Sequence, residues 1–370
     1  MFCHRFLPAL LLAGTSTAVA ATPAVQLQDA VVQALQVDTS ELMIQIEGRP
    51  VAVRREQSRR LPTGDVVWTG TWGGAGKRQA GELNLVRSAA GITGVVRMGT
   101  QSLRIVPVGG GRHLSMPLTA HRLPMHPPGD VPLGRAQGAA AQPAAPAPTS
   151  TIRLLVVATK DAVDGYAGDL RALAELSIAE SNLTYQRSTL DMRVELAGYA
   201  VTPYQETGNM EESLRHLRTR DDGYMDEVHG LRDRHGADVV VLLMNRAFAC
   251  GQAAEIGADA DGAFIAVLEQ CATGDYVLAH EIGHIAGARH DIKRDPGTVP
   301  FAFGHGYWYQ PPRASGWRSV MSYDCPTGCR RIAYWSSPEL LYEGQPTGLA
   351  NEADNRRVLE LTRGKIAAFR

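Results

Sequence analysis

The chain has almost no net charge, so it has little to attract a polyanion. Its 370 residues include 37 lysine and arginine and 38 aspartate and glutamate side chains, which gives a formal net charge of −1. This balance argues against a general electrostatic affinity for nucleic acid or anionic membranes. No apolar run approaches the roughly 20 residues that a transmembrane helix needs. We therefore expect no nucleic acid partner and no membrane span.

Cysteine is scarce, and none occurs between residues 21 and 249. The four cysteines beyond that gap are an even number, as expected of disulfides in an exported chain. Of the three possible pairings we favour Cys250–Cys271 with Cys325–Cys329, because it closes the shortest loops. Four thiolate zinc ligands are the alternative, but the paired C-x-x-C spacing of such sites is missing.

The N-terminus has the features of an export signal. Arg5 precedes an apolar core over residues 6–14, and Ala18-Val19-Ala20 is a small-residue cleavage site. We expect a signal peptide over residues 1–20 and a secreted protein, with the periplasm as the alternative destination. The remaining chain, with 44% hydrophobic and 20% charged residues overall, is globular in composition and long enough for two domains.

Two folded regions and a linker follow the signal. Residues 21–126 hold short β-type runs separated by glycines, which indicates a small antiparallel β domain. Residues 127–150 are rich in Ala, Pro, Gln and Gly and could not bury a core, so they are a linker. Residues 151–370 alternate strand and helix signals, which is typical of an α/β domain. The β-type runs are 66–68, 82–86, 94–98 and 103–108; the later strands are 152–158, 192–200, 237–244 and 263–268, and the helices are 169–187, parts of 210–235, 273–287 and 352–369.

One segment, residues 280–291 (H-E-I-G-H-I-A-G-A-R-H-D), carries the chemistry. On a helix, His280 and His284 lie one turn apart on the same face, close enough to share a metal ion. Gly287 can adopt positive φ, end the helix and turn the chain so that His290 supplies a third ligand. Three imidazoles leave one coordination position open, which distinguishes a catalytic zinc site from a structural one.

Glu281 lies beside these ligands without competing for the ion. A carboxylate there can take a proton from a water at the metal and later pass it to a leaving group, which is hydrolytic chemistry. Residues 319–323 (S-V-M-S-Y) begin 29 residues beyond His290. In a tight turn, Met321 would form a hydrophobic floor beneath the imidazoles; the alternative is an ordinary core methionine.

These segments together resemble the metzincin zinc endopeptidases, nearest the adamalysin/reprolysin branch because Asp291 follows the third histidine. Residues 302–307, 319–323 and 331–338 are similar to secreted bacterial enzymes of the peptidyl-Asp metalloendopeptidase type. The resemblance covers residues 152 to the end. It implies a zincin-like α/β (α+β) domain with a twisted, mostly parallel sheet, an antiparallel edge strand, an active-site helix and a smaller C-terminal lobe.

The resemblance also implies roles for residues. It implies one Zn²⁺ held by His280, His284 and His290, Glu281 as the general base and Met321 as the turn residue. Asp291 would tie the loop of the third ligand to the fold, with a surface carboxylate as the alternative. Strand 263–268 could be an edge strand that binds a peptide substrate through its backbone, or equally a core strand.

Tyr323 matches a tyrosine that binds zinc or stabilises the oxyanion in the astacin and serralysin branches, although the adamalysin branch has no such ligand. A phenol packed in the pocket wall is the alternative. The resemblance also suggests cleavage on the amino side of Asp. The cation that would bind that side chain is left open among four arginines near the motif in sequence, Arg289, Arg313, Arg318 and Arg330.

In a hydrolase, an exposed linker after a β domain is a natural processing site, so we interpret residues 21–126 as an inhibitory propeptide. A mature binding domain is the alternative. Because cysteine is absent there, a thiolate cannot block the zinc, and the candidates are His121, His126 and Asp130, each of which could also be a solvated side chain. The sequence therefore predicts a secreted zinc endopeptidase, acting on proteins or peptides and made as a latent precursor. A non-catalytic adhesion or binding protein on a zincin scaffold is the alternative, although metal retention alone would not require Glu281.

Overall fold

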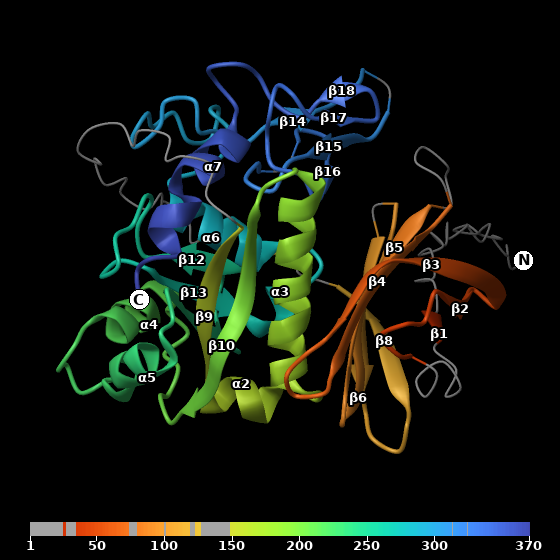
Figure 1. The fold of residues 1–370 in the computed structure, drawn as a ribbon, viewed down its shortest axis with the longest axis horizontal. Helices are drawn as coiled ribbons and strands as arrows, with labels where there is room; N and C mark the ends of the chain where they lie inside the picture. Colours follow the sequence, from red (N-terminus) through yellow and green to blue (C-terminus); the bar gives the residue numbers. More distant parts are fainter. Residues whose placement is uncertain are drawn as a thin grey trace, which may run out of the picture.

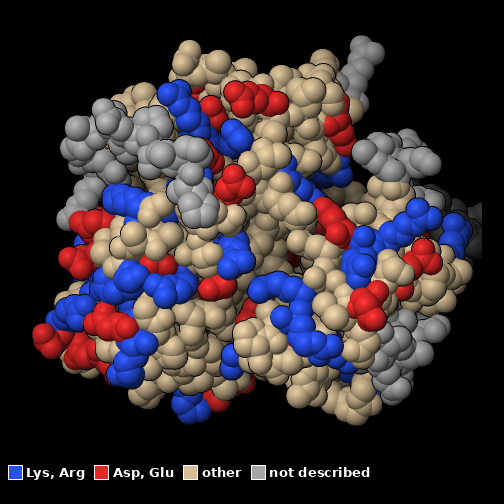
Figure 2. Space-filling view, viewed as in Figure 1, with Lys and Arg blue, Asp and Glu red and all other residues tan. Residues whose placement is uncertain are grey.

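The structure is a computed structural model that describes residues 25–26, 35–73, 80–99, 101–118, 123–126, 149–312, 314–323 and 325–370. The predicted signal peptide and nearly all of the predicted linker lie outside these residues. Two sheets dominate the fold, and helix α3 stands between them (Figure 1). None of the described helices is both long and apolar enough to cross a membrane. On the face drawn in Figure 2, basic and acidic side chains are interspersed over the described surface.

The N-terminal sheet is an antiparallel meander of eight strands that pair in chain order. The four predicted β-type runs fall in its strands β4 to β7, and their inward side chains form a core around the fully buried Trp68. The strands are β1 (Val25–Gln26), β2 (Glu41–Ile46), β3 (Arg49–Arg60), β4 (Val66–Trp72), β5 (Gly81–Ser88), β6 (Gly91–Met98), β7 (Gln101–Pro107) and β8 (His113–Pro117).

The second sheet has the order β10-β9-β11-β13-β12. Its first four strands are parallel, and β12 pairs antiparallel with β13 at the edge. The suggestion that residues 263–268 form the edge was wrong, since β13 lies between β11 and β12. The antiparallel edge strand, β12, has only three residues and no alternating pattern, which is why the sequence did not reveal it. The strands are β9 (Ser150–Thr159), β10 (Met192–Thr202), β11 (Val239–Met244), β12 (Gly251–Ala253) and β13 (Phe264–Leu268).

The helices cover the second sheet, and two of them begin three or four residues later than their sequence patterns suggested. The motif helix starts at Val277 rather than residue 273, because Gly274 (φ 100°) and Tyr276 (φ 56°) are left-handed and cannot continue a helix. The last helix starts at Asn355, where the carboxylate of Asp354 accepts from the N–H of Arg357. The helices are α2 (Lys160–Gly165), α3 (Leu170–Arg187), α4 (Met210–Arg218), α5 (Glu227–His235), the 3₁₀ turn η2 (Glu269–Cys271), α6 (Val277–Ala286) and α7 (Asn355–Ile366).

The segment between α6 and α7 is largely irregular, with short strands that the sequence did not predict. Disulfides join Cys250 to Cys271 and Cys325 to Cys329, which is the pairing that the sequence favoured. The first bond ties the start of β12 to η2, so the edge of the sheet is held to the turn that follows β13. The short strands are β14 (Trp308–Tyr309), β15 (Gly316–Arg318), β16 (Cys329–Arg331), β17 (Leu341–Tyr342) and β18 (Gln345–Pro346).

Helix α3 packs on both sheets. Its side chains Ala172, Leu176 and Ala179 contact the N-terminal sheet, while its other side belongs to the core of the second sheet. A mostly buried ionic network crosses the same interface. Arg97 of β6 binds Glu82 at 2.6 Å, contacts Glu180 of α3, and donates to the carbonyl of Gly274 at 3.0 Å. The N-terminal sheet is therefore docked by charge as well as by apolar contact.

Replacing Arg97 by Ala should destabilise the folded chain by about 3–5 kcal/mol, because the carboxylate of Glu180 stays buried without this partner. Arg54→Ala is the matched control: Arg54 pairs with Glu41 at 3.7 Å, but its side chain is 86% exposed, and such pairs contribute about 0–1 kcal/mol. Urea unfolding of both variants checks this. Equal losses for the two would show that the network does not stabilise the docked sheet.

Candidate active site

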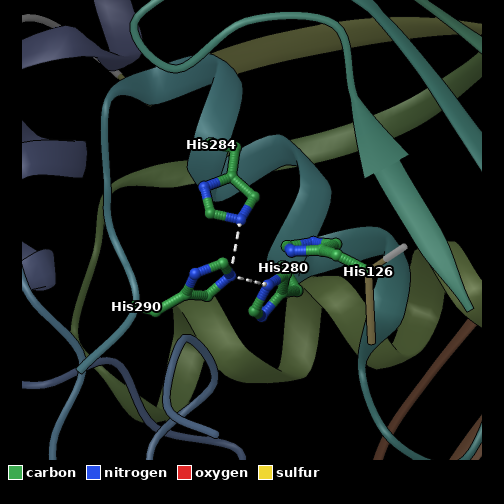
Figure 3. A group of neighbouring side chains, drawn as sticks. All are labelled: His126, His280, His284 and His290. Atoms are coloured by element: carbon green, nitrogen blue, oxygen red, sulfur yellow. Dashed lines mark hydrogen bonds between the residues drawn. The ribbon is translucent and has the colours of Figure 1, made fainter. Parts of the chain in front are cut away.

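Helix α6 presents three of the predicted site residues to one buried point. His280, Glu281 and His284 each have 1% or less of their surface exposed, and so does His290 from the following turn. The Nε2 atom of His290 lies 3.2 Å from Nε2 of His280 and 3.0 Å from Nε2 of His284 (Figure 3). The structure thus brings together all three predicted ligands.

The hydrogen bonds made by Nδ1 of His280 and Nδ1 of His284 determine which nitrogen of each ring carries the proton. Nδ1 of His280 is 2.9 Å from the carbonyl oxygen of Val320, and Nδ1 of His284 is 2.9 Å from that of Ala288. A carbonyl oxygen only accepts, so each Nδ1 carries the proton and each Nε2 turns a lone pair toward the centre. His290 can donate to at most one of them, so at least one pair of lone pairs faces each other. A metal cation at this point would satisfy all three nitrogens.

Burial keeps these rings neutral. It lowers the pKa of His284 to about 4, with the nearby His126 ring adding to the effect. Burial and neighbouring imidazoles also hold the pKa values of His280 and His290 well below the usual range. Because a metal binds the neutral imidazole, the three rings are in the ligating form near neutral pH.

The turn after α6 delivers the third histidine. Gly287 ends the helix with φ of 104°, a conformation that other residues rarely adopt. Asp291 accepts from the N–H of Tyr323 at 3.1 Å and so ties this turn to residues 319–323. Asp295, which the sequence gave no reason to select, lies with Oδ2 3.9 Å from Nδ1 of His290 and binds Arg289 through Oδ1 at 2.8 Å.

Met321 is fully buried beneath α6. A Cβ placed on Gly283 would lie 2.7 Å from its sulfur and 2.8 Å from the ring of Trp335, so the helix can approach this floor only with glycine there. The Nε1–H of Trp335 donates to Thr184 of α3 at 3.0 Å. Gly283 therefore has a packing role that the spacing of the two motif histidines did not indicate.

Tyr323 forms one wall of the site. Its ring centre lies 4.5 Å from that of His290. Burial, together with the charge of Glu281, raises the pKa of Tyr323 to about 12. The phenol is therefore protonated near neutral pH and can donate a hydrogen bond.

A fourth histidine comes from the segment that follows the N-terminal sheet. His126, at the end of the described N-terminal region, lies with Nε2 3.2 Å from Oε1 of Glu281 and Nδ1 3.4 Å from the Tyr323 hydroxyl. One nitrogen from each of His126, His280, His284 and His290 can be chosen so that all lie within 4.8 Å of one another (Figure 3). The other blocking candidates, His121 and Asp130, lie outside the described residues.

A cavity of about 940 Å³ adjoins Tyr323 between the N-terminal sheet and the C-terminal segment. Two of the four predicted arginines line it, whereas Arg289 is buried in its ion pair with Asp295 and Arg313 lies outside the described residues. Four more arginines line the cavity, and their distance from the motif along the sequence gave no reason to name them as candidates. The arginines lining the cavity are Arg97, Arg187, Arg294, Arg318, Arg330 and Arg331.

Most of these arginines have carboxylate partners. Arg330 binds Glu343 at 2.6 Å, while Arg318 and Arg331 lie 3.4 Å and 3.2 Å from the same oxygen of Asp275. Arg294 is exposed and makes no ion pair with a described residue. Its guanidinium carbon lies 5.9 Å from the centre of the Tyr323 ring, which places a cation at the mouth of the site.

Comparison with known proteins agrees with this geometry. The sequence profile described as "Metallo-peptidase family M12" matches residues 148–336. A protein named peptidyl-Asp metalloendopeptidase from Stenotrophomonas maltophilia (strain R551-3) is 40% identical over 363 residues, which cover 92% of this chain and 87% of that protein. One of the same name from Xanthomonas campestris pv. campestris is 40% identical over 89% of this chain and 82% of its own length.

Two further matches are more distant or shorter. A peptidyl-Asp metalloendopeptidase from Pseudomonas fragi is 38% identical over 191 residues, which cover 52% of this chain and all of that protein. A solved structure described as a chaperone-substrate complex has a TM-score of 0.47 and 20% identity, over 76% of this chain and 40% of its own. The family profile and the two long relatives decide the classification: the chain belongs to the metallopeptidase family M12 and is a metalloendopeptidase.

Proposed function

We propose that this chain is a secreted zinc endopeptidase that cleaves on the amino side of Asp and is made as a latent precursor. The observation that carries the proposal is the convergence of three neutral imidazole nitrogens beside Glu281. Tetrahedral zinc with bonds of about 2.0–2.1 Å holds its donor atoms about 3.3 Å apart, close to the separations of the Nε2 atoms here. Three imidazoles are also a known ligand set for catalytic zinc.

Bound there, zinc would lower the pKa of water and polarise the scissile carbonyl. Glu281 takes the proton from the attacking water and returns it to the departing amine nitrogen. The protonated phenol of Tyr323 donates a hydrogen bond to the carbonyl oxygen as negative charge develops on it. Met321 and Asp291 position the ligands from below and from the side.

Two observations support the preference for Asp. The named relatives are peptidyl-Asp metalloendopeptidases, and six arginines are among the residues that line the cavity beside Tyr323. Among them Arg294 is exposed beside Tyr323, whereas Arg318 and Arg331 bind Asp275 and donate to the carbonyl of Ser322. A guanidinium group pairs well with a carboxylate, so Arg294 is our candidate for binding the substrate's Asp side chain.

The division of the chain follows from the same proposal. Residues 1–20 are the signal peptide, 21–126 the propeptide, 127–150 the linker with the processing site, and 151–370 the catalytic domain. The described strand β9 begins at Ser150, so the folded catalytic domain includes the last residue of that linker range. The docked N-terminal sheet and the contact of His126 with Glu281 support the inhibitory role of the propeptide.

Replacing Glu281 by Gln should lower kcat/KM of the processed enzyme by about 10²–10⁴-fold, the usual contribution of a general base. Gln has the same shape but cannot accept the proton. Because residue 281 is not a proposed metal ligand, the substitution should leave zinc bound. Peptide hydrolysis and metal content should be measured on the same sample. Full activity with zinc bound would rule out this role of Glu281.

Replacing Tyr323 by Phe should lower kcat of the processed enzyme by about 100-fold with little change in KM, because the lost hydrogen bond acts on charge that develops in the transition state. The ring and its packing against His290 are retained. Steady-state kinetics on one peptide measures both constants. Unchanged turnover would leave Tyr323 as a wall of the pocket only.

Replacing Arg294 by Ala should reduce the preference for an Asp peptide over the matching Asn peptide by about tenfold to 100-fold, the energy of a hydrogen bond to a charged group. Arg330→Ala is the control, since Arg330 lines the same cavity but is paired with Glu343. The ratio of kcat/KM values for the two peptides is the measurement. If Arg330→Ala lowered the ratio as much as Arg294→Ala, Arg294 would not be the reader of the side chain.

A further inference from the structure

The segment Leu123–His126, which we call the latch segment, lies along the edge of the catalytic sheet. The N–H of Cys250 donates to the carbonyl of Pro124 at 3.0 Å, and the N–H of Gly251 donates to that of Met125 at 3.0 Å. Gly251 is the first residue of β12, an edge strand of the sheet, and Cys250 immediately precedes it. An edge strand is where an extended peptide adds to a sheet through its backbone, so the latch segment occupies a place suited to a substrate.

The latch segment is also held by its side chains. Met125 is 8% exposed and belongs to the main core cluster of the catalytic domain, and Leu123 packs against that cluster. Both residues line the arginine-rich cavity beside Tyr323. The disulfide from Cys250 to Cys271 ties the start of β12 to η2. The latch segment is therefore packed against a surface that the disulfide stabilises.

The imidazole of His126 faces every catalytic group. Its ring centre lies 5.1, 5.0 and 4.7 Å from those of His280, His284 and His290. Its side chain is 1% exposed, so it shields this point from water. It is also the group that Glu281 and Tyr323 contact.

We propose that His126 is a fourth imidazole ligand of the metal in the uncut chain, and that the latch segment blocks the place of a peptide substrate. This rests on the proposed function. Three histidines leave one position open, and a fourth nitrogen donor is chemically matched to zinc. Because the latch segment belongs to the same chain, its local concentration at the metal is high, and no external peptide or water competes well. In this proposal a histidine blocks the metal, because the N-terminal region has no cysteine that could do so.

Processing then has a simple physical consequence. The catalytic domain begins near Ser150 and His126 precedes the linker, so one cut between residues 127 and 149 makes the latch segment a separate molecule. Its local concentration falls to that of the free fragment. The mature enzyme contains no residue of the latch segment, so changes at His126 alter the precursor alone.

The test compares uncut wild type, His126→Ala and His126→Phe, each purified with Co²⁺ in place of zinc for spectra and with zinc for activity. Phe keeps a ring but has no nitrogen donor. Both variants should change the visible absorption of Co²⁺ in the uncut protein, because one nitrogen ligand is lost. Their uncut zinc forms should hydrolyse peptide about tenfold to 100-fold faster than uncut wild type, the scale of effect for one group at a metal site.

The cut and purified catalytic domain is the internal control. It has the same sequence in all three proteins, so its activity must be equal in all of them. If the cut wild type hydrolysed no peptide, the proposed function itself would fail. If the cut forms were active but the uncut variants had the wild-type Co²⁺ spectrum, or stayed as inactive as uncut wild type, the role of His126 would be overturned.

Discussion

The Nε2 atoms of three imidazoles converge on one buried spot, with neighbouring nitrogens only 3.0 to 3.2 Å apart, and at least two of them turn lone pairs toward it. Such an arrangement is unfavourable without a cation, so the rest of the domain has to impose it. Helix α6 fixes His280 and His284 one turn apart. The carbonyls of Val320 and Ala288 hold the outer nitrogens of those rings and so aim the inner ones. The left-handed Gly287 then turns the chain so that His290 completes the set.

The same constraint explains why residues 319–323 matter although none of their side chains is a predicted ligand except, in one alternative, Tyr323. Val320 orients His280, Met321 lies under Gly283, and the N–H of Tyr323 binds Asp291. One short turn thus orients the ring of His280, limits how closely α6 approaches Met321, and holds the turn that carries His290. The spacing from His290 indicated this turn, but its contacts with three separate parts of the site depend on the fold.

Local pattern predicted the parts of the structure that depend on neighbouring residues. The motif gave the ligand geometry, and the long apolar strands and α3 were found close to their true bounds. The edge strand β12 could not be found, because three residues carry no periodic signal and its identity depends on pairing with β13. The choice of Arg294 over Arg289 likewise depends on which ion pairs form across the fold, and distance along the sequence says nothing about that.

The sequence named His126 as a candidate for blocking the zinc but gave no reason to prefer it to His121 or Asp130. As one of three polar residues near the end of the N-terminal region, it had no spacing relation to residues 280–290. The structure separates it from a solvated histidine because three independent contacts act together: the backbone bonds of Pro124 and Met125 to β12, the burial of Met125, and the ring's contact with Glu281. Under the proposed function, a substrate would need the edge strand, the cavity and Glu281 as well. A propeptide on the same chain would then use the surfaces proposed to recognise substrate, and the ionic docking of the N-terminal sheet by Arg97 would hold it there until cleavage of the linker.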